Sequence, residues 1–361
     1  MQLSTMYPAI GDRDVLAASI ALPPAAEQSR IVAKLDVLTA RLARARAELD
    51  RSPRLTDRFQ LLTLRAGVMG QLTEDWRAKA TNVLPVEALL RAVPVPQQGR
   101  GGREATDKTI PGAAGLAVND PGTGLPNGWK WVPLLRVAKQ ETGHTPSRSQ
   151  LSYWDGGVPW IGIRDAGAHH GRYIEETVQT ISEAGLANSS ARLLPSGTVC
   201  LSRTASVGYV TIMGRSMSTS QDFATWTCTD ALLPEYLMYA LMAEGEDIRR
   251  FGMGSTHTTI YFPEIRALHI ALPPREEQRE IIVRIKRALA RASRLEGEAA
   301  RGCALLDRLE SAILTKAFKG ELVPQDPDDE PASVLLDRIR AQRASAPRSK
   351  QTPRSKRRIP A

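Results

Sequence analysis

The feature that most constrains this fold is a duplication, because residues 20–72 recur without a gap as residues 270–322. The first sixteen residues read IALPPAAEQSRIVAKL in one copy and IALPPREEQREIIVRI in the other, and 19 of the 53 aligned positions are identical. An offset of 250 residues is far longer than the roughly 20–50 residues of a solenoid repeat. The duplication therefore predicts one large unit, a globular domain followed by a helix, that occurs twice with its first copy cut short.

Both copies carry the apolar spacing of paired helices. Each opens with a Pro-Pro step, at residues 23–24 and 273–274, and proline is tolerated in a first helical turn because its missing N–H has no partner there. Beyond each step, apolar or small residues recur at intervals of four and three, which is the heptad pattern of a coiled coil. The spacing predicts a long helix over residues 275–318. We expect the two copies to pair with each other, although each helix packing only on its own domain is the plainer alternative. The expected interface residues are Ile31, Leu35, Leu38, Leu42, Ile281, Ile285, Leu295, Leu306, Leu309 and Ile313.

The first helix contains Pro53 where the second has Cys303. A proline inside a helix costs about 3 kcal/mol, because it removes a backbone hydrogen bond and clashes with the preceding turn. We therefore expect a kink or a break there. The apolar spacing then resumes, shifted, at Leu55, Phe59 and Leu62.

Composition divides the remaining chain into segments. Residues 94–124 hold seven Gly and four Pro, which is typical of a flexible linker. Residues 125–270 alternate short apolar strands with turn signals, which predicts a mixed α/β domain. The predicted segments are 1–20, the remnant of a first globular domain; 21–93, a first helical region; 94–124, a linker; 125–270, a complete globular domain; 271–344, a second helical region; and 345–361, a basic disordered tail.

The net charge of +9 suggests a nucleic-acid partner, but its distribution limits that inference. Residues 340–361 hold eight Lys or Arg and no acid, so 9 − 8 leaves only +1 for the rest of the chain. Residues 125–270 carry 12 basic and 13 acidic side chains, which makes the globular domain about neutral. Any charge that faces DNA is therefore local to the helices and the tail.

Several classes of protein are disfavoured by what the sequence does not contain. The three cysteines, Cys200, Cys228 and Cys303, show no pairing or metal-ligand spacing, which favours a reducing cytoplasm. No apolar run has membrane-spanning length, and no signal peptide is evident. His169 and His170 have no third ligand at a suitable spacing, and no phosphate-binding loop or dinucleotide fingerprint is present. We therefore expect no metal, no cofactor, no membrane contact and no catalysis by this chain.

Several long motifs resemble one family, the specificity subunits of type I restriction–modification systems. They are LPNGWKWVPL, TPSRSQLSYWDGGVPWIGIRD, LPSGTVCLSRTASVGYV, STSQDF and GSTHTTIYFPEIRALHIALPPREEQREI, together with the closing LESAILTKAFKGELVPQDPDDEPASVLLDRIRAQR. The resemblance covers nearly the whole chain except the linker and the tail. It implies an α/β target recognition domain joined to long helices that form an antiparallel coiled coil. It also implies double-stranded DNA as ligand and methyltransferase (M) and restriction (R) subunits as partners.

The family resemblance further implies that this subunit is non-catalytic within a site-specific deoxyribonuclease and adenine methyltransferase. One departure concerns residues 1–19, which match only the end of a first recognition domain. We expect either a truncated gene product or a misassigned start. One recognition domain reads only half of a bipartite site, and a homodimer through the helices could restore twofold symmetry. The alternative is a docking scaffold for the methyltransferase that lacks sequence-selective DNA binding.

Sequence-specific binding needs donors aimed at base edges and further contacts to phosphates. Arg203 could donate two hydrogen bonds to guanine, and Gln221 could pair with adenine, although both could be ordinary surface residues. Trp154 and Trp160 are expected to anchor packing rather than to stack on bases. The candidate DNA-binding residues are Lys139, Thr145, Arg148, Ser202, Arg203, Thr204, Ser220, Gln221, Ser255, Thr256 and His257.

Overall fold

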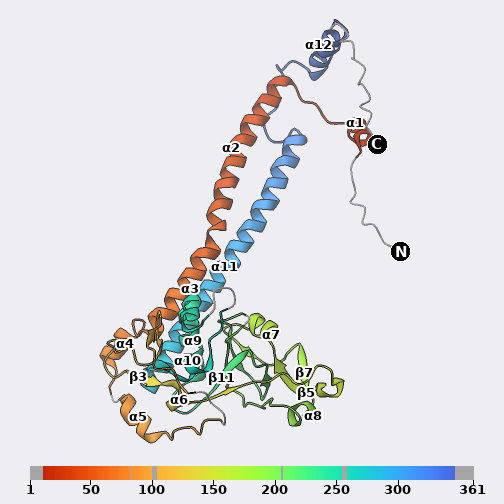
Figure 1. The fold of residues 1–361 in the computed structure, drawn as a ribbon. Helices are drawn as coiled ribbons and strands as arrows, with labels where there is room; N and C mark the ends of the chain where they lie inside the picture. The colour runs from red at the N-terminus through yellow and green to blue at the C-terminus, as the bar shows by residue number, and fades with distance from the viewer. Residues whose placement is uncertain (1–10, 82, 100–103, 205, 254–257, 346–361) are drawn as a thin grey trace, which may run out of the picture. The chain divides into compact units, whose positions relative to one another are not determined.

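A computed structural model describes residues 11–81, 83–99, 104–204, 206–253 and 258–345 of the chain (Figure 1). These residues fall into two compact units. The first is drawn from residues up to 52 and from residue 297 onward, and the second is residues 53–296. No helix in the described part of the chain combines the length and the apolar content that a membrane crossing needs.

Helices are the only regular secondary structure among the described residues of the first unit. Figure 1 shows its two long helices side by side, and contacts between them fix their direction. Arg46 lies 3.4 Å from Glu310 and also pairs with Asp307. A Cβ added at Gly302 would lie 3.0 Å from Leu49 Cδ1. Later residues of one helix thus meet earlier residues of the other, so the pair is antiparallel, as predicted. The elements are α1 (Asp12–Ala17), α2 (Ala25–Asp50), the second half of α11 (Arg275–Phe318) and α12 (Ala332–Ser345).

The Pro-Pro steps set the helix starts as expected. Pro24 is the N-cap of α2, and α11 begins at Arg275, directly after the second step, and ends at Phe318. The predicted break at Pro53 is confirmed, because α2 ends at Asp50 and α3 starts at Ser52.

In the second unit, α3 (Ser52–Val68) packs antiparallel on the first half of α11. A Cβ added at Gly67 would lie 2.7 Å from Ile285 Cδ1, and Gln60 Nε2 lies 3.5 Å from Glu296 Oε1. Glycine is therefore required at residue 67 because it lets the two helix backbones approach closely. Two short helices follow, α4 (Glu74–Lys79) and α5 (Val86–Ala92).

Three sheets build the globular part of this unit, and they mix parallel and antiparallel pairs, which confirms the α/β prediction. The strand orders are β1-β2-β12-β3, β4-β11-β8-β9-β6 and β10-β5-β7. Only the pairs β5–β10 and β6–β9 are parallel among the described strands. The strands are β1 (Ile110–Pro111), β2 (Leu116–Val118), β3 (Lys130–Pro133), β4 (Ala138–Thr142), β5 (Trp154–Ile161), β6 (Tyr173–Ile174), β7 (Gln179–Ile181), β8 (Val199–Ser202), β9 (Val210–Met213), β10 (Ser218–Thr219), β11 (Phe223–Cys228) and β12 (Leu268–Leu272).

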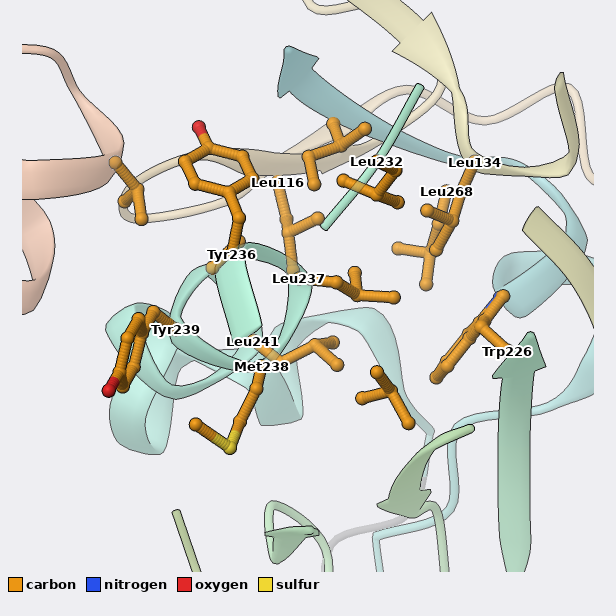
Figure 2. Close-up of a cluster of buried hydrophobic side chains, with 14 of the residues drawn as sticks. Leu116, Leu134, Trp226, Leu232, Tyr236, Leu237, Met238, Tyr239, Leu241 and Leu268 are labelled. Carbon is orange, nitrogen blue, oxygen red and sulfur yellow. The ribbon is translucent and has the colours of Figure 1, made fainter. Parts of the chain in front are cut away.

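The main core forms around α9 (Pro234–Glu244), a helix that is buried on nearly all sides. Figure 2 shows its side chains beside Leu134, Leu268 and Trp226. The hydroxyl of the fully buried Tyr236 donates to the Ala271 carbonyl at 2.7 Å, which satisfies its polar atom inside the core. The smaller helices of this unit are α6 (Leu134–Val137), α7 (Ile163–Ala168), α8 (Glu183–Ala187) and α10 (Phe262–Arg266).

The prediction that residues 94–124 form a flexible linker is wrong for residues 110–118. Strand β2 pairs with β12, and its three residues are almost fully buried. Two glycines of this segment serve close packing: a Cβ at Gly115 would lie 3.1 Å from Val68 Cβ, and one at Gly112 would lie 2.3 Å from a backbone oxygen. The globular domain therefore begins before residue 125.

Candidate nucleic-acid interface

Three of the predicted DNA-binding residues meet at one edge of the globular domain. Thr145 follows β4, Arg203 follows β8, and Gln221 follows β10. Thr145 Oγ1 donates to Gln221 Oε1 at 2.6 Å, and an Arg203 nitrogen donates to the Gln221 carbonyl at 2.9 Å. Residues separated by 76 positions in the sequence thus form one connected group of polar side chains.

Strand pairing brings these loops together. Phe223 of β11 lies opposite Ser202 of β8, so the loop ends next to these residues are neighbours, and the Arg203 amide donates to the Asp222 carbonyl at 2.8 Å. On the other side, the His144 amide donates to the Thr219 carbonyl at 2.9 Å. The backbone therefore fixes the three loops before any side chain contributes.

Arg148 lies on two tryptophan rings near the same edge. Its guanidinium carbon is 4.7 Å from the Trp154 ring centre and 5.7 Å from that of Trp160. The two rings meet edge to face with centres 5.3 Å apart, and Trp160 Nε1 donates to the His144 carbonyl at 3.1 Å. Such cation–π contacts orient an arginine without neutralising it. Arg148 is exposed and has no salt bridge within the described residues, so its charge is available to a ligand.

A hollow of about 420 Å³ lies beside Arg148. Its acidic side chains are already engaged: Asp165 accepts from the backbone amides of residues 162 and 178, and Asp222 accepts from Ser220 Oγ at 3.0 Å. Its exposed arginines, Arg148 and Arg164, are the groups oriented toward solvent. This hollow therefore offers donors to an electron-rich ligand such as a base edge or a phosphate. Its lining is Arg148, Trp160, Gly162, Ile163, Arg164, Asp165, Val178, Gln179, Ser220 and Asp222.

Arg164 and Gln179 were not predicted from the sequence. Arg164 comes shortly after β5, just as Arg203 comes directly after β8. The signal in the sequence was an arginine that follows a buried strand. This signal led to Arg203 after β8, and the same signal after β5 would have identified Arg164.

Two predicted residues need correction because they are buried. Ser202 is fully buried, and its hydroxyl donates to the Ser206 carbonyl and accepts from the Tyr209 amide at 2.8 Å. Ser220 is 2% exposed, and its hydroxyl holds Asp222. Both serines stabilise their loops and cannot reach a base.

The remaining candidates lie in different surroundings. Lys139 shares the single carboxylate of Glu141 with Arg192, at 3.1 and 2.8 Å, so its charge is offset only in part within the protein. Thr204 Oγ1 lies 3.0 Å from Thr259 Oγ1. Ser255, Thr256 and His257 lie outside the described residues.

The predicted helix interface is only partly buried. Ile281 and Ile285 are fully buried, Ile31 and Ile313 are nearly so, and Leu35, Leu38, Leu42 and Leu306 are half-buried. Leu295 and Leu309 are 58% and 49% exposed, so they lie outside the contact between the helices. An α-helix has 3.6 rather than 3.5 residues per turn, so a straight pair drifts off a heptad. The contact consequently moves to Glu296, which meets Gln60, and to Glu310, which meets Arg46.

The apolar residues of α3 also differ from expectation. Leu55, Phe59 and Leu62 are 61%, 48% and 52% exposed, whereas α3 buries Leu64 and Val68. The apolar spacing after Pro53 therefore marks an open face of the helix and not its contact with α11.

The described residues contain no group of three side chains that could hold a metal ion. Burial raises the pKa of the Cys200 thiol strongly and that of the Cys228 thiol to about 12. Both thiols are therefore protonated at neutral pH and are poor nucleophiles.

Comparison with known proteins identifies the family. Residues 126–298 match the model of the type I restriction modification DNA specificity domain. Residues 126–298 belong to the type I DNA specificity domain family. The chain is 26% identical over 349 residues to the EcoKI specificity subunit of Escherichia coli K12, covering 91% of this chain and 64% of that subunit. It is 29% identical over 159 residues to the MjaIX specificity subunit of Methanocaldococcus jannaschii, covering 44% of this chain and 37% of the relative.

Solved structures agree with this assignment. The HsdS subunit from Thermoanaerobacter tengcongensis is 26% identical with a TM-score of 0.52, covering 89% of this chain and 65% of that one. A chain from a type I restriction–modification complex gives a TM-score of 0.59 at 26% identity, covering 88% of this chain and 66% of that one. This chain thus spans about two-thirds of the length of the solved subunits.

Proposed function

We propose that this chain is the sequence-recognition subunit of a type I restriction–modification complex. It binds double-stranded DNA through residues 104–270, has no catalytic step of its own, and directs methyltransferase and restriction subunits to a target site in the cytoplasm. The observation that carries the proposal is the edge at which Arg148, oriented by two tryptophans, lies near the Thr145–Gln221–Arg203 group.

The chemistry of this edge suits base edges in the major groove. The guanidinium of Arg148 is planar and can donate two parallel hydrogen bonds to guanine. Gln221 Oε1 accepts one hydrogen bond from Thr145, which leaves a second lone pair and the amide N–H groups. That set matches the donor and acceptor that adenine presents. The domain is close to neutral, so we infer that it selects sequence and adds little phosphate attraction.

Substitution of Arg148 tests the proposal. The full chain, with its methyltransferase subunit, is first used to select its preferred sequence from random DNA. We then expect Arg148→Ala to weaken binding of that sequence about 5- to 100-fold, because one bidentate base contact is worth about 1–3 kcal/mol. Arg148→Lys should lose nearly as much, since an ammonium keeps the charge without the planar fork. Dissociation constants for selected and scrambled DNA provide the readout.

The exposed Arg215, in the turn between β9 and β10, is the matched control. Arg215→Ala should leave the ratio of the two dissociation constants unchanged. Equal binding of selected and scrambled DNA by the unmodified chain would contradict sequence recognition. It would favour the alternative, a docking scaffold, provided that the methyltransferase still co-purifies.

Exposed apolar stripes support the proposed subunit contacts. Leu55, Phe59 and Leu62 form one stripe on α3, and Leu305 and Leu309, 61% and 49% exposed, form another on α11. Contiguous apolar surface marks protein-binding sites. We assign these stripes to the methyltransferase subunit, and a homodimer through the helices is the other arrangement. Sedimentation of the chain alone distinguishes the two arrangements. If the chain is a monomer at micromolar concentration, the homodimer is contradicted.

A further inference from the structure

The three members of the Thr145–Gln221–Arg203 group differ in how far they reach into solvent. Gln221 is exposed, whereas Thr145 and Arg203 are half-buried. Ser220 and Asp222, which flank Gln221 in the sequence, both line the hollow described above. Gln221 is therefore the member of the group that a ligand meets first, and both of the others bond to it.

The turn that carries Gln221 is fixed before any ligand binds. The Ser220 amide donates to the Ile161 carbonyl at 3.1 Å, and the Ser220 hydroxyl donates to Asp222 Oδ2 at 3.0 Å. Phe223, two residues after Gln221, is fully buried. A side chain on a turn that is already ordered loses little conformational freedom when it binds a ligand.

Arg203 supports the same turn from the end of β8. Its amide donates to the Asp222 carbonyl at 2.8 Å, and its guanidinium donates to the Gln221 carbonyl at 2.9 Å. The guanidinium carbon also lies 4.5 Å from the centre of the Phe262 ring, a distance at which a cation is attracted to the ring face. The backbone and the side chain of Arg203 thus both hold the turn, and its guanidinium is engaged within the protein.

Thr145 fixes which end of the Gln221 amide faces outward. The Thr145 hydroxyl lies 2.6 Å from Gln221 Oε1, a length typical of an O–H···O bond and shorter than most N–H···O bonds. The amide oxygen therefore faces Thr145, and the amide nitrogen lies on the opposite side. The backbone sets the place of Thr145, because the neighbouring His144 amide donates to the Thr219 carbonyl at 2.9 Å. A Cβ at Gly143 would overlap the same carbonyl, so glycine is needed for this approach.

An amide held in this way distinguishes the two purines. Adenine presents an acceptor, N7, beside a donor, the N6 amino group, whereas guanine presents two acceptors, N7 and O6. Gln221 can donate from Nε2 to adenine N7 while the second lone pair of Oε1 accepts from N6. The same orientation sets Oε1 against guanine O6, which places two acceptors together without a hydrogen between them. An amide that rotates freely avoids that conflict by donating from Nε2 to O6.

We propose that Thr145 and Arg203 are positioning residues that hold Gln221 in an orientation which accepts adenine and rejects guanine. This inference rests on the proposed DNA recognition, and it names the base that Gln221 reads and the two residues that make the reading selective. Arg203 acts through the turn of Gln221 and not by donating to guanine.

The first test locates the base. The full chain with its methyltransferase subunit selects its preferred sequence from random DNA, and the selection is repeated with Gln221→Ala. We expect Gln221→Ala to abolish the preference at one position, at which the unmodified chain selects adenine, and to leave the other positions unchanged. Gln71→Ala, at an exposed glutamine that follows α3, is the matched control and should change no position.

The second test measures positioning. Thr145→Val removes the hydroxyl at nearly constant size, and it should lower the preference for adenine over guanine at that position about 3- to 10-fold, which is the value of one hydrogen bond. Thr145→Ser keeps the hydroxyl and should keep the preference. Arg203→Met keeps an apolar side chain on the Phe262 ring but cannot donate, so it should reduce the preference at the same position. Thr39→Val, at an exposed position of α2, is the control and should change nothing.

Modified DNA separates loss of the base contact from a general loss of structure. 7-Deazaadenine lacks the N7 acceptor, so it should weaken binding by the unmodified chain about 3- to 10-fold. It should weaken binding by Gln221→Ala no further. 2,6-Diaminopurine keeps the major-groove edge of adenine and adds an amino group in the minor groove, so it should bind as adenine does. A loss with this base would place the contact in the minor groove and contradict the proposal.

Three further results would overturn the proposal. Gln221→Ala changes no position, or changes one at which the unmodified chain does not select adenine. Thr145→Val leaves the preference for adenine over guanine intact, or Thr145→Ser loses it as fully as valine does. Arg203→Met removes a preference for guanine at another position, which would make Arg203 a base reader. In each case the unmodified chain still selects a sequence, so the proposed DNA recognition stands. Selection of no sequence by the unmodified chain would contradict both proposals.

Discussion

Glu27 and Glu277 occupy equivalent positions in the two copies of the repeat but lie in different environments. The same substitution at each position should therefore change the free energy of unfolding by different amounts. Glu277→Gln removes the charge that Arg77 pairs with and an acceptor for Thr73 or Trp129. We expect the free energy of unfolding to fall by about 3 kcal/mol. Glu27→Gln removes a buried charge whose Oε1 has no described donor, so stability should stay the same or rise by up to about 1 kcal/mol. Denaturant unfolding of both variants checks this, and equal losses would contradict it.

Glu244 is a second buried carboxylate, and it should make stability depend on pH. It accepts from the backbone amides of residues 113, 114 and 116 at 2.5, 3.2 and 3.2 Å. Burial raises its pKa in the folded protein, and these amides oppose the rise only in part. A raised folded pKa means that protonation favours folding, so this contribution is present below the unfolded pKa of about 4.3 and is lost as pH rises through the folded pKa.

The variant Glu244→Gln isolates this contribution, because glutamine does not titrate. We expect the difference in unfolding free energy between the unmodified chain and the variant to be largest near pH 4.5 and to shrink toward pH 7.5. Denaturant unfolding across this range measures it. A difference that grows with pH would show that the amides, and not burial, dominate the pKa of Glu244.

At the scale of elements, Gly67 controls how closely α3 approaches α11. A side chain there would meet Ile285, which is fully buried and has no room to move away. Gly67→Leu should lower the free energy of unfolding by about 2–3 kcal/mol through overpacking. Gly297 is the control, because the nearest atom to an added Cβ is an arginine nitrogen at 3.7 Å. Gly297→Leu should be neutral or stabilising by up to about 1 kcal/mol, since glycine disfavours a helix interior. Similar losses at both glycines would contradict close packing at residue 67.

The elements also show what the sequence could predict and what it could not. Local rules placed the start of α11 after Pro274 and the break before Pro53, because proline constrains its own backbone. Heptad spacing predicted pairing but misplaced Leu295 and Leu309, because small departures from 3.5 residues per turn accumulate along a helix. Residues 110–118 were misinterpreted because glycine serves close packing as well as flexibility. At the edge proposed to bind DNA, Ser202 and Arg203 are adjacent in sequence, and only strand pairing decides which of them is buried.

For the whole molecule, sequence recognition and general attraction to DNA should come from different parts of the chain. Residues 125–270 are about neutral, with 12 basic and 13 acidic side chains, whereas residues 346–361 hold six basic residues and no acid. Each phosphate neutralised changes log K by about −0.9 per unit of log salt concentration. Deleting residues 346–361 should therefore make the slope of log K against log salt concentration shallower by up to about five. It should also weaken binding of scrambled DNA at low salt.

The same deletion should leave the ratio of dissociation constants for scrambled and selected DNA unchanged at any one salt concentration, because phosphate contacts carry no sequence information. Arg148→Ala should do the reverse, reducing the ratio while changing the slope little. Titrations of both proteins over 50–200 mM salt, about the range in which phosphate contacts dominate, give the two quantities together. A deletion that lowers the ratio would place base recognition in the tail and remove the central role assigned to the edge of Arg148 and Gln221.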